Sequence, residues 1–491
     1  MLSFGSPVYA LGEADSTTEE NIGESEFLEN DSLNEQAVPA GKDSENEAEL
    51  EANDLSNADK EEVEEEIKTE EEIDDRPSSK IMENKKDSSN ADSDNNSKSE
   101  ENEHNTIVEK GNIVFYLNDQ GYVRYAEEYE NNRIVSVMQF YPNSSPDNYN
   151  KNIKYQFMID ADGYIEKAVK LEQGTQRILN WYQYYPNTKY GDHAKNIKYK
   201  FNLNNSGYVT KATKREKGSQ RILNWYEYYP KTEYGNHGKN IKYRFKINKS
   251  GYVSSAIKRE EGSTRILNRY VYYPKTKYGN HGKNIKYRFS LNKSGYVSSA
   301  TKRERGTGRI LKWYSYSPKT KYGNHGSRIT GIKLNVPIIS QLPLLPTGCE
   351  ITAVTMMVNY AGANANEVSL AREMPKHGWD PNKGYVGNPF TKRGWTIYPP
   401  ALTAQVRKYA GSARNLTGVT NRSLERHLFN KPVVVWVSPM HGFTVHAITL
   451  TGYDKNNYYY NDPWTGKRNV KISKKSFNKL WGNQKKRAIT Y

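Results

Sequence analysis

A segment of 44 residues recurs through the middle of the chain and limits the folds that this region can adopt. The tetrapeptide Asn-Ile-Lys-Tyr begins at Asn152, Asn196, Asn240 and Asn284, and a Gly-Tyr pair follows each copy in register. A more divergent copy begins near Asn112, so we expect about five units, the first and last atypical. Repeats of this length stack side by side, because a single unit cannot bury its own apolar face.

Within one unit, apolar and polar residues alternate as they do in a β-strand. Tyr199 and Phe201 fall on one strand face, and the lysines beside them fall on the other. The turn sequence that ends in Gly207 closes this strand, and two further strands follow before Pro230. Each unit is therefore predicted to be a three-stranded meander, and residues 107–330 an elongated all-β repeat array.

The repeated aromatic and basic side chains of the array allow two interpretations. Tryptophan occupies one repeat position at Trp181, Trp225 and Trp313, and the fourth unit has Arg269 there. If these rings are exposed, they and the nearby tyrosines would stack on sugar rings while Lys and Arg attract anionic polymers. If the rings are buried, they form the core and the charges form a solvated face.

Nucleic acid would also suit an aromatic and basic surface. It is the less favoured ligand, because a strongly acidic segment of the same chain would compete for that surface. The expected partner of the array is therefore an anionic cell-wall polymer or glycan.

One histidine recurs in each unit, in a Gly-Asn-His or Gly-Asp-His sequence. A metal would need further ligands, and neither a cysteine nor a paired histidine supplies them. We interpret these histidines as loop residues and expect no metal or other cofactor; the four are His193, His237, His281 and His325.

The N-terminal region and the rest of the chain carry opposite charge. Residues 1–106 contain 33 Asp and Glu against 8 Lys and Arg, a net charge of −25. The remainder contains 24 acidic and 63 basic residues, a net charge of +39, which gives the overall +14. Runs such as 61–66 offer too little apolar surface to offset the entropy of ordering the chain. Residues 11–106 are therefore predicted to be disordered.

Residues 1–10 end in Val8-Tyr-Ala10, the small-residue pattern of a signal-peptidase site, but lack a basic start and a full apolar segment. We interpret them as a signal peptide shortened at its front, which predicts a secreted, extracellular protein; an ordinary N-terminus is the alternative. The longest apolar runs, such as 433–437, are too short to span a bilayer, so no transmembrane segment is expected.

The chain contains one cysteine, Cys349, which has no partner for an intrachain disulfide. Apolar residues at helical spacing predict an amphipathic helix that runs from this cysteine to Gly362. Thr347 and Glu350 have the spacing of a capping box, so Thr347 is the predicted N-cap. Cys349 would lie in the first turn, where free N–H groups and the helix dipole favour a thiolate. Both a nucleophile and a small buried apolar residue fit this position.

A cysteine nucleophile needs a histidine and a third group that orients the imidazole ring. His446 lies in the second of three strands predicted near the C-terminus, and Asp462 lies at the end of the third. A regular hairpin about the intervening turn sets Asp462 opposite Thr449. The strand must therefore bend or end at Asp462 for the carboxylate to reach His446. His441 competes with His446 for the same role.

Four sequence blocks carry a resemblance to a known family. In chain order they are Val-Pro-Ile-Ile-Ser-Gln341, Pro-Thr-Gly-Cys349-Glu, His446-Ala-Ile-Thr-Leu-Thr-Gly-Tyr-Asp and Tyr-Asn-Asp462-Pro-Trp. Together they resemble the papain-fold cysteine peptidases of the bacteriocin-leader (double-glycine leader) type. More closely, they resemble extracellular relatives of these peptidases in Gram-positive bacteria that lack a transporter.

This resemblance implies a papain-like α+β domain over residues 334–491. It implies that Cys349 is the nucleophile, His446 the general base and acid, and Asp462 the orienting group. It also implies that the Gln341 amide and the Cys349 backbone N–H form an oxyanion hole.

Two departures from the leader peptidases affect the expected substrate. Those peptidases usually read Cys-Gly-Pro-Ala, whereas this chain reads Cys349-Glu-Ile-Thr, and its Gln341 lies further upstream. Both departures point to the extracellular branch and away from a double-glycine leader substrate. The predicted function is a secreted cysteine peptidase-like hydrolase that cleaves a peptide or amide bond in a peptide or protein. The alternative is a cell-surface adhesin or scaffold with an inactive peptidase-like domain.

Overall fold

The computed structural model describes residues 106–491, so the segments predicted to be a signal peptide and a disordered acidic region lie outside the described residues. The described chain divides into two compact units. One unit contains residues 106–308 and 317–328, and the other contains residues 309–316 and 329–491. In this part of the chain, no helix combines the length and apolar character needed to cross a membrane.

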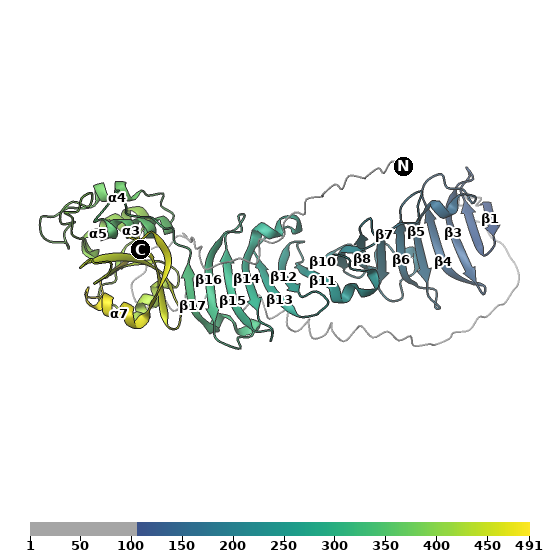
Figure 1. Cartoon of the computed structure of the whole chain (residues 1–491). Coiled ribbons are helices and arrows are strands. Elements are labelled where there is room, and N and C mark those ends of the chain that lie inside the picture. Colours follow the sequence, from purple (N-terminus) through teal and green to yellow (C-terminus); the bar gives the residue numbers. More distant parts are fainter. Residues whose placement is uncertain (1–105) are drawn as a thin grey trace, which may run out of the picture. The chain divides into compact units, whose positions relative to one another are not determined.

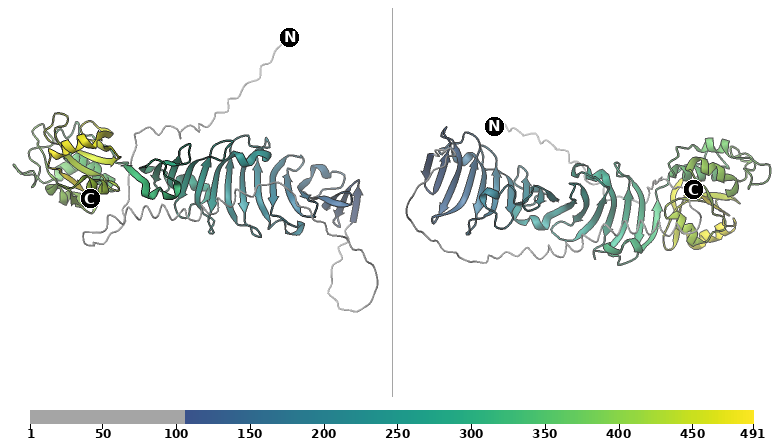
Figure 2. Two further views of the ribbon diagram at one scale, coloured as in Figure 1. Left: turned by 90° about the horizontal axis from the view of Figure 1, so that it is seen from below. Right: turned by 180° about the vertical axis from the view of Figure 1, so that it is seen from behind.

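The first unit is an antiparallel sheet in which every strand from β1 to β15 pairs with the next along the chain (Figure 1, Figure 2). Its strands are β1 (Thr106–Lys110), β2 (Ile113–Leu117), β3 (Val123–Glu130), β4 (Arg133–Phe140), β5 (Ile153–Ile159), β6 (Ile165–Leu171), β7 (Ile178–Tyr184), β8 (Ile197–Leu203), β9 (Val209–Arg215), β10 (Ile222–Tyr228), β11 (Ile241–Ile247), β12 (Val253–Arg259), β13 (Ile266–Tyr272), β14 (Ile285–Leu291) and β15 (Val297–Arg303). Short 3-10 turns are η2 (Tyr149–Lys151), η3 (Tyr190–Asp192), η4 (Tyr234–Asn240), η5 (Tyr278–Asn284), η6 (Tyr322–Asn324) and η7 (Gly326–Arg328).

The strands of the array repeat at the period of the sequence. From β5 to β13, each 44-residue period contains three strands, as the alternating pattern predicts. The turn between β8 and β9 closes with Gly207 at φ 81°, a left-handed conformation that glycine adopts without strain. The Gly207 N–H donates to the Asn204 carbonyl at 3.0 Å, so the repeated glycine is what allows each tight turn.

Successive 44-residue repeats place their apolar side chains on opposite faces of this sheet. Phe201, Ala212 and Tyr226 lie directly opposite one another on neighbouring strands and therefore share one face. The next unit's Phe245 lies opposite Trp225, the chain neighbour of Tyr226, and so faces the other way. The buried clusters around Phe201 and Phe245 accordingly lie on opposite faces of the sheet.

The residue at the repeat position of Trp181 and Trp225 packs against the next 44-residue repeat. Trp181 and Trp225 are half-buried, and each joins the apolar cluster that follows it in the chain. One face of each indole is covered by a tyrosine, so these rings contribute to packing between units. The stacked pairs are Trp181–Tyr234 and Trp225–Tyr278, with ring centroids 4.6 Å apart, and Arg269–Tyr322, with the guanidinium carbon 4.7 Å from the ring centroid.

The repeated histidines lie in or at the end of the 3-10 turns η3 to η6, between strands, and their rings pack against the array. In each, Nδ1 bonds to the carbonyl oxygen of the tyrosine three residues earlier. The imidazole also meets a buried phenylalanine edge-on. The ring pairs are His193–Phe157 at 4.7 Å, His237–Phe201 at 4.6 Å, His281–Phe245 at 4.5 Å and His325–Phe289 at 4.5 Å.

The second compact unit combines α-helices with a β-sheet. Strand β20 lies within this sheet and pairs with β17, β19 and β21. Helix α3 packs on it, and the Thr449 hydroxyl of β20 donates to the Ala353 carbonyl at 2.9 Å. The elements are β16 (Ile310–Tyr316), β17 (Ile329–Leu334), α3 (Cys349–Tyr360), α4 (Glu367–Glu373), α5 (Pro399–Ala410), β18 (Arg414–Asn415), α6 (Asn421–Leu428), β19 (Val433–Val437), β20 (His446–Tyr453), β21 (Asn457–Asp462), β22 (Lys467–Ser473), α7 (Lys474–Gly482) and β23 (Ala488–Thr490).

Candidate active site

Helix α3 begins at Cys349, so the cysteine occupies the first helical position. Gly348 is the N-cap, and no side chain caps the helix. The predicted capping box is therefore wrong: the Thr347 hydroxyl instead donates to the carbonyls of Asn388 and Thr391. The helix is also buried on nearly all sides, whereas the sequence pattern predicts an amphipathic helix with a polar face.

Glu350 turns into the core instead of back to the start of the helix. Its Oε1 accepts a hydrogen bond from the Thr396 hydroxyl at 2.5 Å. The Cys349 thiol is a further hydrogen-bond partner of this carboxyl group. Burial raises the pKa of Glu350 to about 7, because the charged form loses its hydration. The carboxyl group is therefore largely protonated below neutral pH.

The environment of Cys349 opposes ionisation of its thiol. Burial raises the pKa of Cys349 well above its ordinary value, and the adjacent Glu350 raises it further. A hydrogen bond with the backbone of Ala447 acts in the opposite direction but does not outweigh burial. The expected preference for a thiolate at the helix start is therefore not met. The resting thiol is neutral near pH 7.

Asp462 and His446 meet because strand β20 contains a bulge. The register near the turn, continued without a break, would set Asp462 opposite Thr449, on the face away from His446. Strand β20 gains one residue between Leu450 and Gly452, which shifts the pairing by one position. Because side chains alternate between faces, this shift brings Asp462 to the side of His446. The predicted contact is present, and a bulge in β20 produces it.

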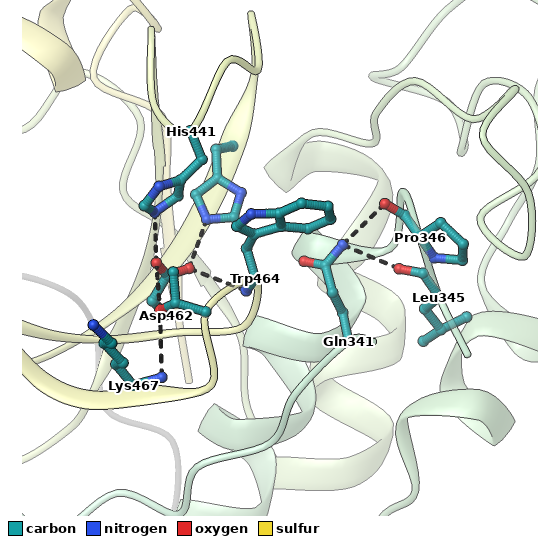
Figure 3. A network of polar contacts seen from close by, with 9 residues as sticks. Gln341, Leu345, Pro346, His441, Asp462, Trp464 and Lys467 are labelled. Carbon is teal, nitrogen blue, oxygen red and sulfur yellow. Dashed lines mark hydrogen bonds and ion pairs between the residues drawn. The ribbon is translucent and has the colours of Figure 1, made fainter. Parts of the chain in front are cut away.

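Asp462 is the centre of a hydrogen-bond network (Figure 3). Its Oδ1 accepts from His446 Nε2 at 2.9 Å and from the Trp464 backbone N–H at 3.1 Å. Its Oδ2 accepts from His441 Nε2 at 2.6 Å and from the Thr465 hydroxyl at 2.9 Å. Burial alone raises the pKa of Asp462, but these bonds and the charge of His446 outweigh it and set the pKa at about 2. The carboxylate is therefore ionised near neutral pH.

The network leaves one nitrogen of His446 available. Since Nε2 donates to the carboxylate, the basic lone pair of the neutral ring is on Nδ1. This Nδ1 is buried and has no hydrogen-bond partner within residues 106–491. The next residue, Ala447, bonds to the Cys349 thiol through its backbone. The main chain next to His446 therefore contacts the thiol.

Two aromatic residues that sequence reasoning did not assign hold the His446 ring. Phe443 stacks on it with ring centroids 5.7 Å apart and 15° between the planes. Trp464 meets Phe443 edge-on at 4.8 Å. The available signal was the position of Trp464 directly after Asp462-Pro463 in one of the resembling blocks.

His441 and His446, which the sequence leaves as competitors, both bind Asp462. His446 is fully buried, whereas the His441 side chain is 31% exposed and its backbone has φ 52°. Within the described chain, these three residues are the group whose donor atoms lie close enough, within 4.8 Å, to hold a metal. The carboxylate oxygens already accept N–H bonds at 2.6 and 2.9 Å, so the arrangement is a His-Asp-His hydrogen-bond network.

Gln341 lies near the segment that follows Asp462, and its side-chain amide is already hydrogen-bonded (Figure 3). Its backbone N–H donates to the Pro463 carbonyl at 2.9 Å, and its side chain is 1% exposed. The amide nitrogen donates to the carbonyls of Leu345 at 3.0 Å and Pro346 at 3.2 Å. An oxyanion-hole role for Gln341 therefore requires the amide to release one of these carbonyls.

Comparison with known proteins identifies the C-terminal domain. Residues 333–489 match the sequence profile of the family described as Peptidase_C39 like. The uncharacterized protein YvpB of Bacillus subtilis (strain 168) is 30% identical over 176 residues, which cover 30% of this chain and 70% of YvpB. The chain belongs to the C39-like peptidase family. A crystal structure described as a C39-like peptidase from Bacillus anthracis is 30% identical and covers 32% of this chain and 93% of that chain, with a TM-score of 0.30.

Membership of the C39-like family confirms the resemblance drawn from the four sequence blocks. It assigns a peptidase-like hydrolase domain to the C-terminal region. The repeat array lies outside the matched residues 333–489, so the family assignment applies to the C39-like domain alone.

Proposed function

We propose that the C39-like domain is a cysteine hydrolase that cleaves a peptide or amide bond. Cys349 is the nucleophile, His446 the general base and acid, and Asp462 the group that orients the imidazole. The observation that carries the proposal is the free Nδ1 of His446. Asp462 holds the ring through Nε2, and the backbone of Ala447, the next residue, bonds to the Cys349 thiol.

The reaction begins from a neutral thiol. His446 Nδ1 accepts the proton of Cys349 as the sulfur attacks the carbonyl carbon of the substrate. The resulting imidazolium is stabilised by the Asp462 carboxylate, which stays ionised because its pKa is about 2. The imidazolium then gives its proton to the leaving amine as the C–N bond breaks and a thioester forms. Water, deprotonated by His446, attacks the thioester, and the acid and free thiol are released.

The start of helix α3 supplies a donor for the oxyanion of this reaction. Cys349 is the first helical residue, and the N–H groups of a first turn have no partner within their helix. We assign Gln341 as the second donor, which moves away from the Leu345 or Pro346 carbonyl when substrate binds. This motion would also give the buried, unpartnered Gln341 Oε1 a new environment.

Exposed apolar side chains on loops flanking Thr347 suggest the kind of substrate. Leu342 follows Gln341, and Trp395 precedes Thr396, which bonds Glu350. We propose that these residues form one apolar patch, which is the kind of surface that marks a recognition site. We infer a peptide or protein substrate with apolar side chains near the cleaved bond; the exposed residues are Leu342 at 40%, Leu344 at 56%, Trp379 at 73% and Trp395 at 49%.

The second part of the proposal concerns the place of action. We infer that the protein acts outside the cell, where the basic array holds the hydrolase on an anionic polymer of the cell surface. The support is the net charge of +39 on residues 107–491, together with the length of the repeated sheet.

An inactive scaffold is the competing function. Two observations favour it: burial raises the pKa of Cys349, and both N–H groups of the Gln341 amide are already bonded. An inactive domain would need neither a reactive thiol nor a free oxyanion donor.

Labelling of the full chain with an electrophilic cysteine-peptidase probe separates the two functions. Cys349 is the only thiol, so every label reports on this site. We expect His446→Ala to lower the labelling rate at pH 7 by at least about a hundredfold, because proton transfer is worth that much. His427→Ala, in helix α6, is the matched control and should change the rate less than about twofold. Equal labelling of wild type and His446→Ala would leave the scaffold as the function.

A further inference from the structure

A tight turn before strand β20 carries His441 to Asp462. The Met440 N–H donates to the Phe443 carbonyl at 3.2 Å, and the Phe443 N–H donates to the Met440 carbonyl at 2.9 Å. The two residues between them, His441 and Gly442, both have left-handed backbones, with φ 52° and 81°. Asparagine and glycine are the usual residues of a two-residue turn with this geometry. The histidine therefore occupies a strained position, and such strain is typical of functional sites.

The turn is held in place by bonds that do not involve the His441 side chain. On one flank, the Ser438 carbonyl accepts from the Asn483 amide at 2.8 Å. On the other flank, the Gln484 amide donates to the Thr444 carbonyl at 3.1 Å. Because the residues that follow helix α7 fix both flanks, the imidazole of His441 is not needed to close the turn.

The His441 imidazole holds the oxygen of Asp462 that His446 does not use. His441 Nε2 donates to Oδ2 at 2.6 Å, and His446 Nε2 donates to Oδ1 at 2.9 Å. The Thr465 hydroxyl also donates to Oδ2, and the Trp464 N–H also donates to Oδ1, so each oxygen accepts two bonds (Figure 3). The carboxylate therefore cannot rotate about its Cβ–Cγ bond without breaking bonds on both oxygens.

The same turn also contacts the His446 ring. Phe443 stacks on this ring with 15° between the planes. The His441 ring meets it edge-on, with centroids 5.5 Å apart and 80° between the planes. One short turn thus contacts both members of the His446–Asp462 pair.

We propose that His441 is a positioning residue of the hydrolase, which fixes the Asp462 carboxylate in the orientation that holds the His446 ring for proton transfer from Cys349. Rotation of the carboxylate would misplace the base, and small misplacements of a reacting group lower the rate steeply. The His441 N–H also draws negative charge from the carboxylate, which limits how strongly Asp462 stabilises the His446 imidazolium. This inference rests on the proposed function, because it assigns a role within the same reaction.

Labelling of Cys349 in the full chain with an electrophilic cysteine-peptidase probe tests this role through three substitutions of one residue. His441→Leu has similar bulk but no donor and should slow labelling at pH 7 by about tenfold. His441→Gln places an amide N–H within reach of Oδ2 and should keep the rate within about threefold of wild type. His441→Asn suits the left-handed turn but is too short to reach Oδ2. It should slow labelling as His441→Leu does, with a melting temperature no lower than that of wild type.

The pH profile of labelling separates positioning from a purely structural role. The rate should fall at low pH as His446 gains a proton. In His441→Leu more negative charge remains on Asp462 for the imidazolium, so the midpoint of this fall should move up by about half a pH unit. Burial and the charge of Asp462 raise the pKa of Tyr460 to about 12, so this neighbour stays neutral across the profile.

The control is His427→Leu, at a half-buried histidine of helix α6, which should change the rate less than about twofold. An unmoved midpoint in His441→Leu, or a slow His441→Gln that melts as wild type does, would overturn the inference. Slower labelling in His446→Ala without slower labelling in His441→Leu would overturn this inference alone. Equal labelling of His446→Ala and wild type would overturn the proposed function and this inference with it.

Discussion

The array and the C39-like domain are both rich in β-strands, but they join their strands over very different distances along the chain. In the array, the contacts between units connect residues about one period apart, such as Gln183 and Tyr234, 51 positions apart. In the C39-like domain, the Asn461 amide donates to the Val336 carbonyl, 125 positions away. Contacts between neighbouring repeats build a repeating surface. Contacts between residues far apart in the sequence enclose a single site.

This difference in contact distance along the sequence determines whether the charged groups of each region are buried or exposed. The closed core of the C39-like domain contains His446, Asp462 and Glu350 at 0 to 1% exposure. Burial raises the pKa of Glu350, whereas hydrogen bonds and the charge of His446 lower the pKa of Asp462. The array instead carries its cations along the faces of an open sheet, where Lys170, Lys200 and Arg215 are half-buried. A buried site suits bond chemistry, and a repeated surface suits attachment. The following predictions test this division.

The largest effect is expected from Asp462→Asn. An amide in place of the carboxylate cannot accept N–H bonds from both histidines and cannot stabilise the imidazolium. We expect probe labelling of Cys349 at pH 7 to slow by about a thousandfold. Asp454→Asn, in the turn of the same hairpin, is the control and should stay within about threefold of wild type. A similar loss in both variants would assign the effect to the hairpin fold.

Glu350→Gln should remove a pH dependence of stability. The folded pKa of about 7 is raised above the unfolded value of about 4.3, so folding retains a proton that the unfolded chain loses. Wild-type stability should therefore fall as pH rises from about 4 to 7, by up to about 3 kcal/mol. Thermal unfolding between pH 4 and 8 should show Glu350→Gln gaining relative to wild type as pH increases. The partly exposed Glu367→Gln should follow wild type; a parallel curve for Glu350→Gln would contradict the burial argument.

Trp225→Ala should destabilise the array by about 2 kcal/mol, because it removes a half-buried ring stacked on Tyr278. The reciprocal change, Arg269→Trp, places the repeat's usual residue over Tyr322 and should be neutral or stabilising by about 0.5 kcal/mol. Chemical denaturation of the full chain measures both. Loss of stability in Arg269→Trp would show that the arginine is required at that position.

The smallest effect is expected from the acidic N-terminal region. Residues 11–106 supply most of the net charge of −25 and are tethered to the array, so they should compete for its cations. Deleting them should strengthen sedimentation with poly(glycerol phosphate) or purified cell walls by a few-fold at low salt. The gain should shrink at high salt, because the charges are then screened beyond about 8 Å. Unchanged sedimentation would show that this region does not mask the array.

Local sequence pattern was sufficient to predict much of both regions. The 44-residue period, the three strands of each unit and the glycine turns follow from alternation and turn chemistry, which depend on neighbouring residues only. The pairing of His446 with Asp462 was implied by the family resemblance, whereas a regular hairpin placed Asp462 opposite Thr449. The helix after Cys349 was predicted from its spacing, but its cap was not, because Thr347 is engaged by residues about 40 positions later.

Register and burial were decided by the tertiary structure. The bulge near Gly452 that brings Asp462 to His446, and the alternation of apolar faces between units, depend on how strands align. That alignment is set by packing across the sheet and is invisible in a single strand. The raised pKa of Cys349 and the protonated Glu350 depend on the depth of a core built from distant segments. The sequence by itself therefore determined which groups are present and in what order, and folding determined which of them lose water and meet.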